Sequence, residues 1–328
     1  MLVSHPDNMT EKLNMNSSTR QDTDSQFKTG DADSYNDVVD YFDRYTERFA
    51  RHLPGPMMDL AFVQADHHVL DVGTGTGIVA LDVAVRLEDG GKVVGIDLSD
   101  GMLATAIAKA ERLQLSEHTQ FLKMDAENLE FPDNSFDAAL SLYALRHFPN
   151  PEKSVAEIYR VVKPGANIVV AVGSQPTLVS LEGIKAVMRR LGSIGRKTLG
   201  RELQACEFMD SLVEKHIPKN SRDEISAWTG EHHEFSGSIK ELVKGAGFGA
   251  VRSVWKGQYS IIESPEDFWL LQMTFSSLAR KRITEADQNT VEKLKSEFYQ
   301  ACEQVLGRNG RLVYQTGAAI VSGRKPLS

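Results

Sequence analysis

The chain has little of what marks disulfide-rich, metal-binding, membrane-spanning or nucleic-acid-binding proteins. Two cysteines, Cys206 and Cys302, lie far apart among 328 residues, which predicts neither a disulfide framework nor a zinc site. No apolar run approaches the roughly 20 residues of a membrane span, so we expect no stable membrane insertion. The net charge of −8 disfavours nucleic acid as a partner, because a phosphate backbone attracts positive surfaces.

The remaining composition is that of an ordinary globular protein, with 41% hydrophobic and 25% charged residues. The N-terminus lacks the basic and apolar regions of a signal peptide, so a cytoplasmic location is expected. The length fits one large or two small domains and leaves the oligomeric state open.

The apolar pattern divides the chain into four segments. Residues 1–34 are rich in Ser, Asn, Asp, Thr and Gln and are expected to form a disordered tail. Over 35–174, an amphipathic helix is followed by strands that alternate with helices. Helices and loops without a strong strand fill 175–237, and strands and helices return over 238–328.

This alternation predicts an α/β fold with a mostly parallel sheet of seven strands and helices on both faces. The expected strands lie at 67–72, 91–98, 119–125, 136–145, 167–172, within 251–262 and within 311–325. In such a fold, ligands bind where the strands end at their carboxyl edge.

A glycine-rich loop, VLDVGTGTG (69–77), joins the first expected strand to a helix. Glycine lets the backbone turn sharply and approach a ligand closely. A P-loop would need Lys-Ser or Lys-Thr after the last glycine, Gly77, and a dinucleotide loop would need glycine in place of Ile78. The pattern instead fits D-x-G-x-G-x-G, the S-adenosylmethionine (SAM) loop of methyltransferases, with Asp71 as the acid.

A second carboxylate, Asp97, ends the next expected strand, twenty positions after Gly77. An acid there can accept hydrogen bonds from both ribose hydroxyls of a nucleoside. Capping of the following helix is the alternative role, and we assign that role to Ser99 or Asp100.

Four segments in order resemble class I SAM-dependent methyltransferases, in particular the ubiquinone/menaquinone biosynthesis methyltransferase group and its small-molecule relatives. They are VLDVGTGTG (69–77), GIDLSDGML (95–103), MDAENLEFPDNSFD (124–137) and LYALRHFPNPEKSVAEIYRVVKPGA (142–166). The resemblance implies a Rossmann-like fold with an antiparallel last strand, SAM as cofactor and S-adenosylhomocysteine as product. It also implies that 175–237 forms a helical lid over the acceptor.

The resemblance also implies a role for each matching position in binding SAM. The backbone of Gly73, Thr74 and Gly75 should hold the methionine moiety, with Asp71 near its ammonium group and Asp97 on the ribose. The other positions implied are Gly77 in the loop, Leu98 and Met102 on the adenine faces, Asp125 and Ala126 at its edge, Leu142 below the sulfonium, and Tyr45, with Tyr41, closing over the cofactor. Core packing is the alternative for the apolar side chains and for the tyrosines.

Methyl transfer from a sulfonium requires mainly a positioned acceptor and exclusion of water. A hydroxyl, phenol or enol acceptor also needs a base, and His147 is the leading candidate because it follows the fourth strand. A loop histidine without chemistry is the alternative. Arg146 matches an arginine of quinone-modifying relatives, but His147 replaces their asparagine, which argues against quinone C-methylation. Arg146 could bind an anionic acceptor or brace the loop, and Tyr143 could line the pocket.

Two further segments could serve the acceptor. His232 or His233 with Glu234 could form a dyad, although a solvated loop is the commoner meaning of such a run, and adjacent histidines lack the spacing of a zinc site. In the lid, apolar side chains could cover a hydrophobic substrate, while Lys and Arg between 185 and 201 could form a solvated face or contact an acidic acceptor or an anionic membrane. Trp269 and Phe275 could enlarge the pocket or belong to the core.

We therefore expect SAM-dependent methylation of a small, hydrophobic metabolite, at oxygen first. Carbon methylation of a quinol-, phenol- or polyketide-like acceptor comes second. A nucleic-acid methyltransferase is disfavoured by the charge and by LSLYAL (140–145), which stands where such enzymes carry Asn/Asp-Pro-Pro-aromatic. A SAM-binding protein without methyl transfer is the rival from another class.

Overall fold

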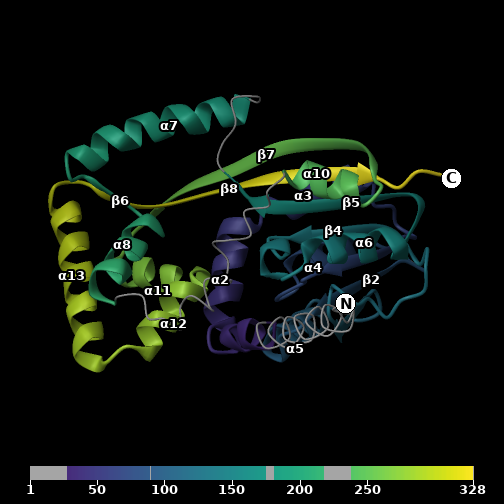
Figure 1. The fold of residues 1–328 in the computed structure, drawn as a ribbon, viewed down its shortest axis with the longest axis horizontal. Helices are drawn as coiled ribbons and strands as arrows, with labels where there is room; N and C mark the ends of the chain where they lie inside the picture. Colours follow the sequence, from purple (N-terminus) through teal and green to yellow (C-terminus); the bar gives the residue numbers. More distant parts are fainter. Residues whose placement is uncertain (1–27, 89, 175–180, 218–237, 328) are drawn as a thin grey trace, which may run out of the picture.

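The structure, a computed structural model, describes residues 28–88, 90–174, 181–217 and 238–327. An eight-stranded sheet runs through the molecule in the order β3-β2-β1-β4-β5-β8-β6, with β7 paired to β8 (Figure 1). The strands are β1 (His68–Val72), β2 (Lys92–Asp97), β3 (Thr119–Lys123), β4 (Phe136–Leu142), β5 (Val162–Gly173), β6 (Glu202–Gln204), β7 (Gly249–Ile262) and β8 (Arg311–Arg324).

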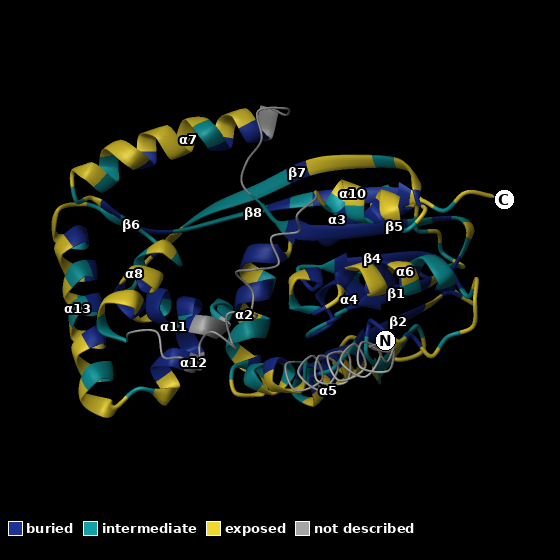
Figure 2. Cartoon of the chain, in the orientation of Figure 1, coloured by how far each residue is buried: buried dark blue, intermediate teal, exposed yellow. Residues whose placement is uncertain are grey.

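Successive residues of the central strands point to opposite faces of the sheet, which creates two apolar cores. Val69 packs on one face with helices α3 and α4, and Leu70 packs on the other face with α6 and α10. Buried strands with apolar residues on both faces are typical of a parallel sheet covered by helices. Figure 2 shows β1, β4 and β5 as the most deeply buried part of the fold. The helices around the sheet are α2 (Val39–Ala50), α3 (Pro54–Ala61), α4 (Ile78–Arg86), α5 (Asp100–Arg112), α6 (Pro151–Val161) and α10 (Ile239–Gly245).

The predicted Rossmann-like, mostly parallel sheet is confirmed, with one addition. Strands β1 to β5 pair in parallel, and the last strand, β8, is antiparallel to β5 and to β7. The eighth strand, β6, lies within the segment where no strong strand was expected. Its three residues are too few to show an alternating apolar pattern.

Strand β8 is longer than its neighbour β5, and this leaves part of one edge open. Ala318–Arg324 pair with β5, and Arg311–Val313 pair with β6. Leu312 and Val313 also pair with β7, so β7 and β6 lie on opposite edges of β8. The edge that carries β6 is the same edge that pairs with β5. Among the described residues, no strand therefore lies beside the backbone of β8 between these two pairings on this edge.

A helical unit extends the molecule beyond the sheet, on the left in Figure 1. Its helices are α8 (Glu207–His216), α11 (Pro265–Phe275), α12 (Ser277–Glu285) and α13 (Gln288–Gly307), and α7 (Leu181–Thr198) lies against β7 and β6. A third apolar core holds the unit together, with Phe268, Trp269 and Phe298 at its centre. Trp269 is thus a core residue.

Residues 28–36 form a helix, although composition assigned everything up to 34 to a tail. This helix lies beside the carboxyl edge of the sheet and contributes to the cavity described below. In the part of the chain that the structure describes, no helix has both the length and the apolar character of a membrane span.

Replacement of Phe298 by alanine should destabilise the protein strongly. The ring is fully buried and packs against Phe268 and Trp269, with ring centroids 5.8 and 5.0 Å away. We expect the free energy of unfolding in urea to fall by about 3–5 kcal/mol. Leu113→Ala, at a position 50% exposed, is the control and should cost less than about 1 kcal/mol. A similar small loss for Phe298→Ala would show that the third core does not stabilise the fold.

Candidate active site

A cavity of about 610 Å³ opens at the carboxyl edge of the sheet, where β1, β2 and β4 end. This volume is in the range of small-molecule sites. Its wall comes from the glycine loop, the helix 28–36, the loop after β4 and the open edge of β8. Segments from both ends of the chain therefore meet around one cavity.

The glycine loop turns sharply because three of its residues adopt left-handed backbone conformations. Gly73, Gly75 and Gly77 have φ angles of +70°, +53° and +83°. The amides of Gly73 and Thr74 both donate to the Ile96 carbonyl of β2, at 2.9 Å each. These bonds hold the loop against the neighbouring strand, and α4 begins directly after Gly77.

Asp71 is a buried carboxylate beneath this loop. Its Oδ2 accepts hydrogen bonds from the Thr74 hydroxyl at 2.7 Å and from the Ala80 amide at 3.1 Å. Its Oδ1 is buried and has no hydrogen-bond partner among the described residues. Burial raises the pKa of Asp71 to about 7. A buried anion with an unused oxygen suits a cationic ligand group such as an ammonium.

Asp97 lies at the end of β2 and organises the loop from the other side. Its Oδ2 accepts from the Gly75 amide at 2.9 Å, and its Oδ1 accepts from the Ser99 amide at 3.0 Å. Burial raises the pKa of Asp97. Ser99, one of the two expected caps, is the N-cap of α5 and accepts from the Met102 amide at 3.2 Å.

The positions that the resemblance assigns to the adenine also line the cavity, and a lysine that sequence reasoning missed lies beside them. The lining residues from this side are Leu98, Met102, Asp125 and Ala126. Lys28 forms ion pairs with Asp125 at 2.7 Å and with Glu127 at 2.8 Å. The sequence did not indicate this contact, because the residues around Lys28 are polar and Asp125 lies 97 positions further along the chain.

The segment after β4 places Tyr143, Arg146 and His147 at the cavity wall. Tyr143 has a φ angle of +60°, and its amide donates to the Ala171 carbonyl of β5 at 2.8 Å. A 3-10 turn, η1 (Leu145–His147), follows. The Arg146 guanidinium donates to the Gly173 carbonyl at 2.7 Å, so this arginine braces the loop.

His147 is paired with a carboxylate from the N-terminal helix. Its Nδ1 lies 2.9 Å from Oδ2 of Asp31, whose side chain is 8% exposed. Burial lowers the pKa of His147, but the hydrogen bond and the charge of Asp31 outweigh this, so the pKa is raised. With Nδ1 engaged by the carboxylate, Nε2 is the nitrogen left for a substrate proton.

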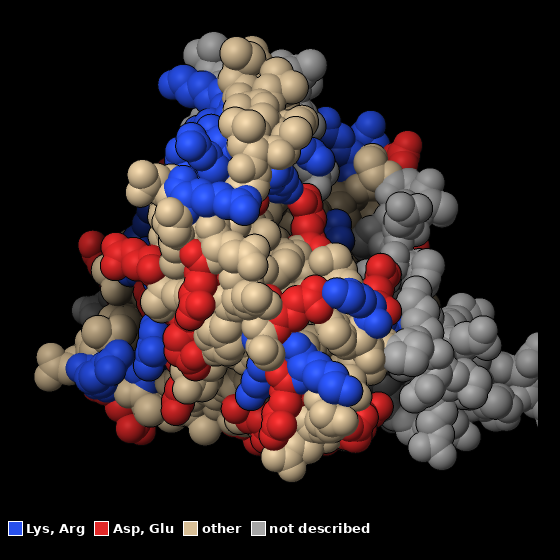
Figure 3. Space-filling model, turned by 90° about the vertical axis from the view of Figure 1, so that its left-hand side faces the viewer, with Lys and Arg blue, Asp and Glu red and all other residues tan. Residues whose placement is uncertain are grey.

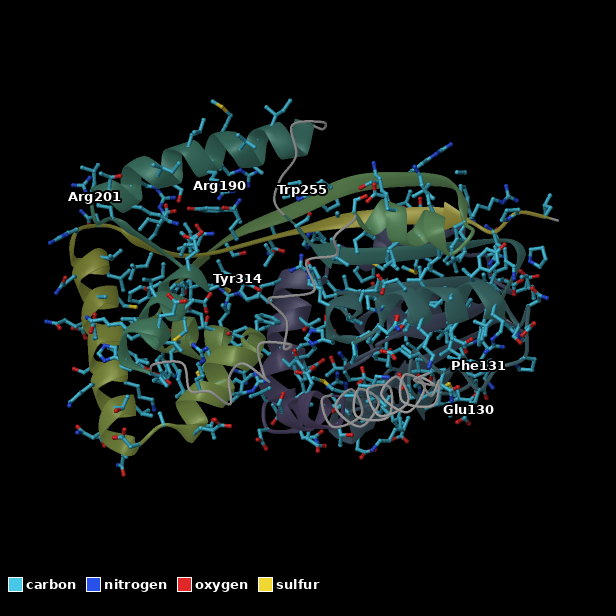
Figure 4. All side chains as sticks on the ribbon, viewed as in Figure 1. Glu130, Phe131, Arg190, Arg201, Trp255 and Tyr314 are labelled. Atoms are coloured by element: carbon cyan, nitrogen blue, oxygen red, sulfur yellow. The ribbon has the colours of Figure 1, made fainter. Side chains whose placement is uncertain are left out.

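The far end of the cavity is aromatic and contains buried hydroxyl groups without partners. Phe275 and Tyr314 stack with ring centroids 5.7 Å apart, and Figure 4 shows Tyr314 between β8 and the helical unit. Gln315 and Thr316, on the open edge of β8, also line the wall. The hydroxyls of Ser174 and Thr316 are buried and have no hydrogen-bond partner among the described residues. Such groups are costly to bury alone and suit a polar ligand group.

Several of the remaining sequence predictions fall outside this cavity. Gly77 and Tyr45 do not line it, and the Tyr45 hydroxyl instead donates to Asp267 at 2.6 Å. His232 and His233 lie outside the described residues. Leu142 lines the cavity. In the described ranges, no group of three or more His, Cys, Asp or Glu is placed to hold a metal ion.

Comparison with known proteins agrees with this geometry. Residues 70–170 match a family model described as "Methyltransferase domain". Together with the sheet order and the glycine loop, this match identifies a class I SAM-dependent methyltransferase domain, whose cofactor is SAM. Over this region the chain is similar to curated members of the ubiquinone/menaquinone biosynthesis methyltransferase group.

Two relatives illustrate the similarity. Demethylmenaquinone methyltransferase of Thermus thermophilus is 43% identical over 113 residues, which cover 34% of this chain and 50% of that protein. Ubiquinone/menaquinone biosynthesis C-methyltransferase of Cronobacter sakazakii is 26% identical, covering 58% of this chain and 78% of that protein. The chain thus spans about half the length of the demethylmenaquinone methyltransferases that it matches. Among solved structures, YcgJ of Bacillus subtilis superposes with a TM-score of 0.48 at 20% identity, covering 84% of this chain and 98% of that one.

Gly73→Ala should block the cavity at the glycine loop. A Cβ at Gly73 would lie 2.2 Å from the Ala144 Cβ, so the loop would have to move. We expect the affinity for S-adenosylhomocysteine, measured by titration calorimetry, to fall by about tenfold or more. Gly90→Ala is the matched control, because Gly90 also has a left-handed φ, +90°, but has open space around it. Unchanged affinity in Gly73→Ala would contradict binding at this loop.

Proposed function

We propose that this chain transfers a methyl group from SAM to a small, ring-shaped acceptor that carries an ionisable hydroxyl. The observation that carries the proposal is the continuous cavity, which joins the glycine loop to the His147–Asp31 pair and to the aromatic end at Phe275 and Tyr314. One end of this cavity has the chemistry for a cationic amino acid moiety and a nucleoside. The other end has the chemistry for an aromatic ring with polar substituents.

The proposed cofactor contacts follow from the polar groups on the wall. Asp71, with its unused oxygen, would hold the ammonium group, and the amides of the glycine loop would lie along the methionine moiety. Asp97 would accept from the ribose, because each of its oxygens retains a lone pair beside its backbone bond. SAM supplies an electrophilic methyl group on a sulfonium.

His147 would act as the base on the acceptor. Asp31 holds Nδ1, and neutral Nε2 would then take the hydroxyl proton of the acceptor. The resulting oxyanion shares its charge with the neighbouring ring carbons. The methyl group is attacked from the ring carbon while its bond to sulfur breaks. The ring proton then leaves to water, its bonding pair restores the aromatic ring and the oxyanion, and protonated His147 returns the hydroxyl proton to that oxygen. Tyr314 and Phe275 would hold the ring, and the Thr316 hydroxyl would meet a polar substituent.

The atom that receives the methyl group is proposed to be carbon. The sequence favoured oxygen, because a histidine stands where quinone-modifying relatives have asparagine, but the comparisons do not support that preference. Several of the curated relatives that the chain matches are named C-methyltransferases. A base beside a phenolic hydroxyl serves carbon methylation as well as oxygen methylation, because deprotonation activates both positions.

The proposal is tested by incubating the protein with isotopically labelled methyl-SAM and a metabolite extract, then by mass spectrometry. A labelled aromatic product with the label on a ring carbon is the expected outcome. His147→Gln should lower kcat by about 10²–10⁴-fold without a comparable change in S-adenosylhomocysteine affinity. His118→Gln, at the opposite edge of the sheet, is the matched control and should be unaffected. Intact S-adenosylhomocysteine binding with no labelled product from any quinol or phenol would favour the rival, a SAM-binding protein without methyl transfer.

The pH dependence of kcat/KM should report the His147–Asp31 pair. The base must be neutral, so activity falls as pH drops through the His147 pKa, which Asp31 raises above its ordinary value of about 6.5. Asp31→Asn removes that charge, so the acid limb should move to lower pH even if kcat falls. Asp33→Asn, an exposed residue of the same helix, should leave the limb in place. An acid limb that does not move in Asp31→Asn would exclude His147 as the base.

A further inference from the structure

Helix α7 carries a row of large apolar side chains that face solvent. Ile184, Met188, Leu191 and Ile194 are 43%, 64%, 59% and 56% exposed. Their spacing of four, three and three residues places them on one side of the helix. Leu199, just after the helix end, is 66% exposed. We call these five side chains the α7 stripe. The sequence suggested that apolar residues here cover the substrate, but none of the stripe lines the cavity.

The opposite side of α7 rests on the sheet through small residues. Ala186 and Ser193 are 4% and 3% exposed, and the helix packs on β7 and β6. The Ser193 hydroxyl donates to the Glu202 carboxylate, and Arg196 pairs with the same carboxylate at 2.6 Å. The orientation of α7 is therefore fixed by contacts on its inner side, and the stripe is directed outward.

Cationic side chains lie along one flank of the stripe and at the end of the helix, although two of them, Arg196 and Lys197, are paired with Glu202 and Glu207. Residues 183–201 contain six Lys or Arg and no Asp or Glu, in a chain whose net charge is −8. Lys185 and Arg189 lie on one flank, and Figure 4 shows Arg190 on the side of α7 toward the sheet and Arg201 beyond its end. Figure 3 shows Lys and Arg gathered around an uncharged ridge where α7 is seen nearly end-on.

We propose that α7 docks this protein on the surface of an anionic lipid membrane, with the α7 stripe among the acyl chains and the flanking cations at the headgroups. An exposed apolar row bordered by Lys and Arg is the chemistry of an interfacial helix. A second copy of the chain fits less well, because a symmetric contact through the stripe would bring the two sets of cations together.

The position of α7 connects this surface to the cavity. The chain leaves the cavity wall at Ser174, forms α7, and returns to the wall at Cys206. The segment that carries the stripe is therefore joined to the cavity wall at both of its ends, which suits an acceptor that partitions into lipid. This link to the acceptor rests on the proposed function, whereas the docking itself does not.

Flotation of the full chain with lipid vesicles tests the docking without any methyl transfer. The probes are vesicles of phosphatidylcholine alone and vesicles with about a quarter of phosphatidylglycerol. We expect binding to the anionic vesicles that weakens as salt is raised. The triple variant Met188→Gln, Leu191→Gln, Ile194→Gln should lower the fraction bound by about tenfold. The double variant Lys185→Gln, Arg189→Gln should lower it on anionic vesicles only.

Matched variants separate the stripe from general surface effects. Val85→Gln, Ile107→Gln, Leu113→Gln changes three exposed apolar residues elsewhere and should bind as the unaltered protein does. Lys92→Gln, Arg112→Gln does the same for charge. Unchanged melting temperatures confirm folding of each variant. No flotation of the unaltered protein, full flotation of the stripe variant, or a stripe-dependent dimer in sedimentation without vesicle binding would each overturn the proposal.

Discussion

The site depends on one carboxylate that folding has removed from water. Asp71 is 1% exposed, and its Oδ2 connects the Thr74 hydroxyl of the glycine loop to the first turn of α4 through the Ala80 amide. Because burial disfavours the charged form of Asp71, the anion carries a free-energy cost in the protein without a ligand. A bound cation would remove that cost. In the proposed function, the group that shapes the loop is therefore also the group that would hold a positively charged ligand.

The parts of the site that sequence could predict are those encoded within a few residues. The glycine loop needs positive φ angles at fixed spacing, and Asp97 follows from the length of one βα unit, so both were placed correctly at the cavity. Ser99 was one of two capping candidates, and the structure selects it. These features can be predicted from sequence because the strand, the turn and the helix that form them follow one another directly in the chain.

The residues that sequence missed are brought to the site by distant pairings. Lys28 and Asp31 reach Asp125 and His147 across 97 and 116 residues. The composition of a polar segment without an apolar face predicts disorder. The helix 28–36 is instead stabilised by tertiary ion pairs, which an apolar periodicity in the sequence does not reveal. Tyr45 was misplaced for a related reason. Its partner, Asp267, lies 222 residues away, and nothing local indicates that the hydroxyl turns toward it.

This contrast between local features and distant pairings explains why the sequence indicates the cofactor better than the acceptor. Apart from the N-terminal helix that carries Lys28, the glycine-loop side of the cavity is built from successive βα units between residues 71 and 126. The aromatic side is assembled from β8, the end of α11 and the residue before α8. Its shape depends on the gap in β8 between Arg311–Val313, which pair with β6, and Ala318–Arg324, which pair with β5. A change in any of these segments alters the wall that faces the acceptor and leaves the SAM motifs intact. Specificity can therefore diverge on this fold while the first four motifs stay recognisable, because the two ends of the cavity are built from different parts of the sequence.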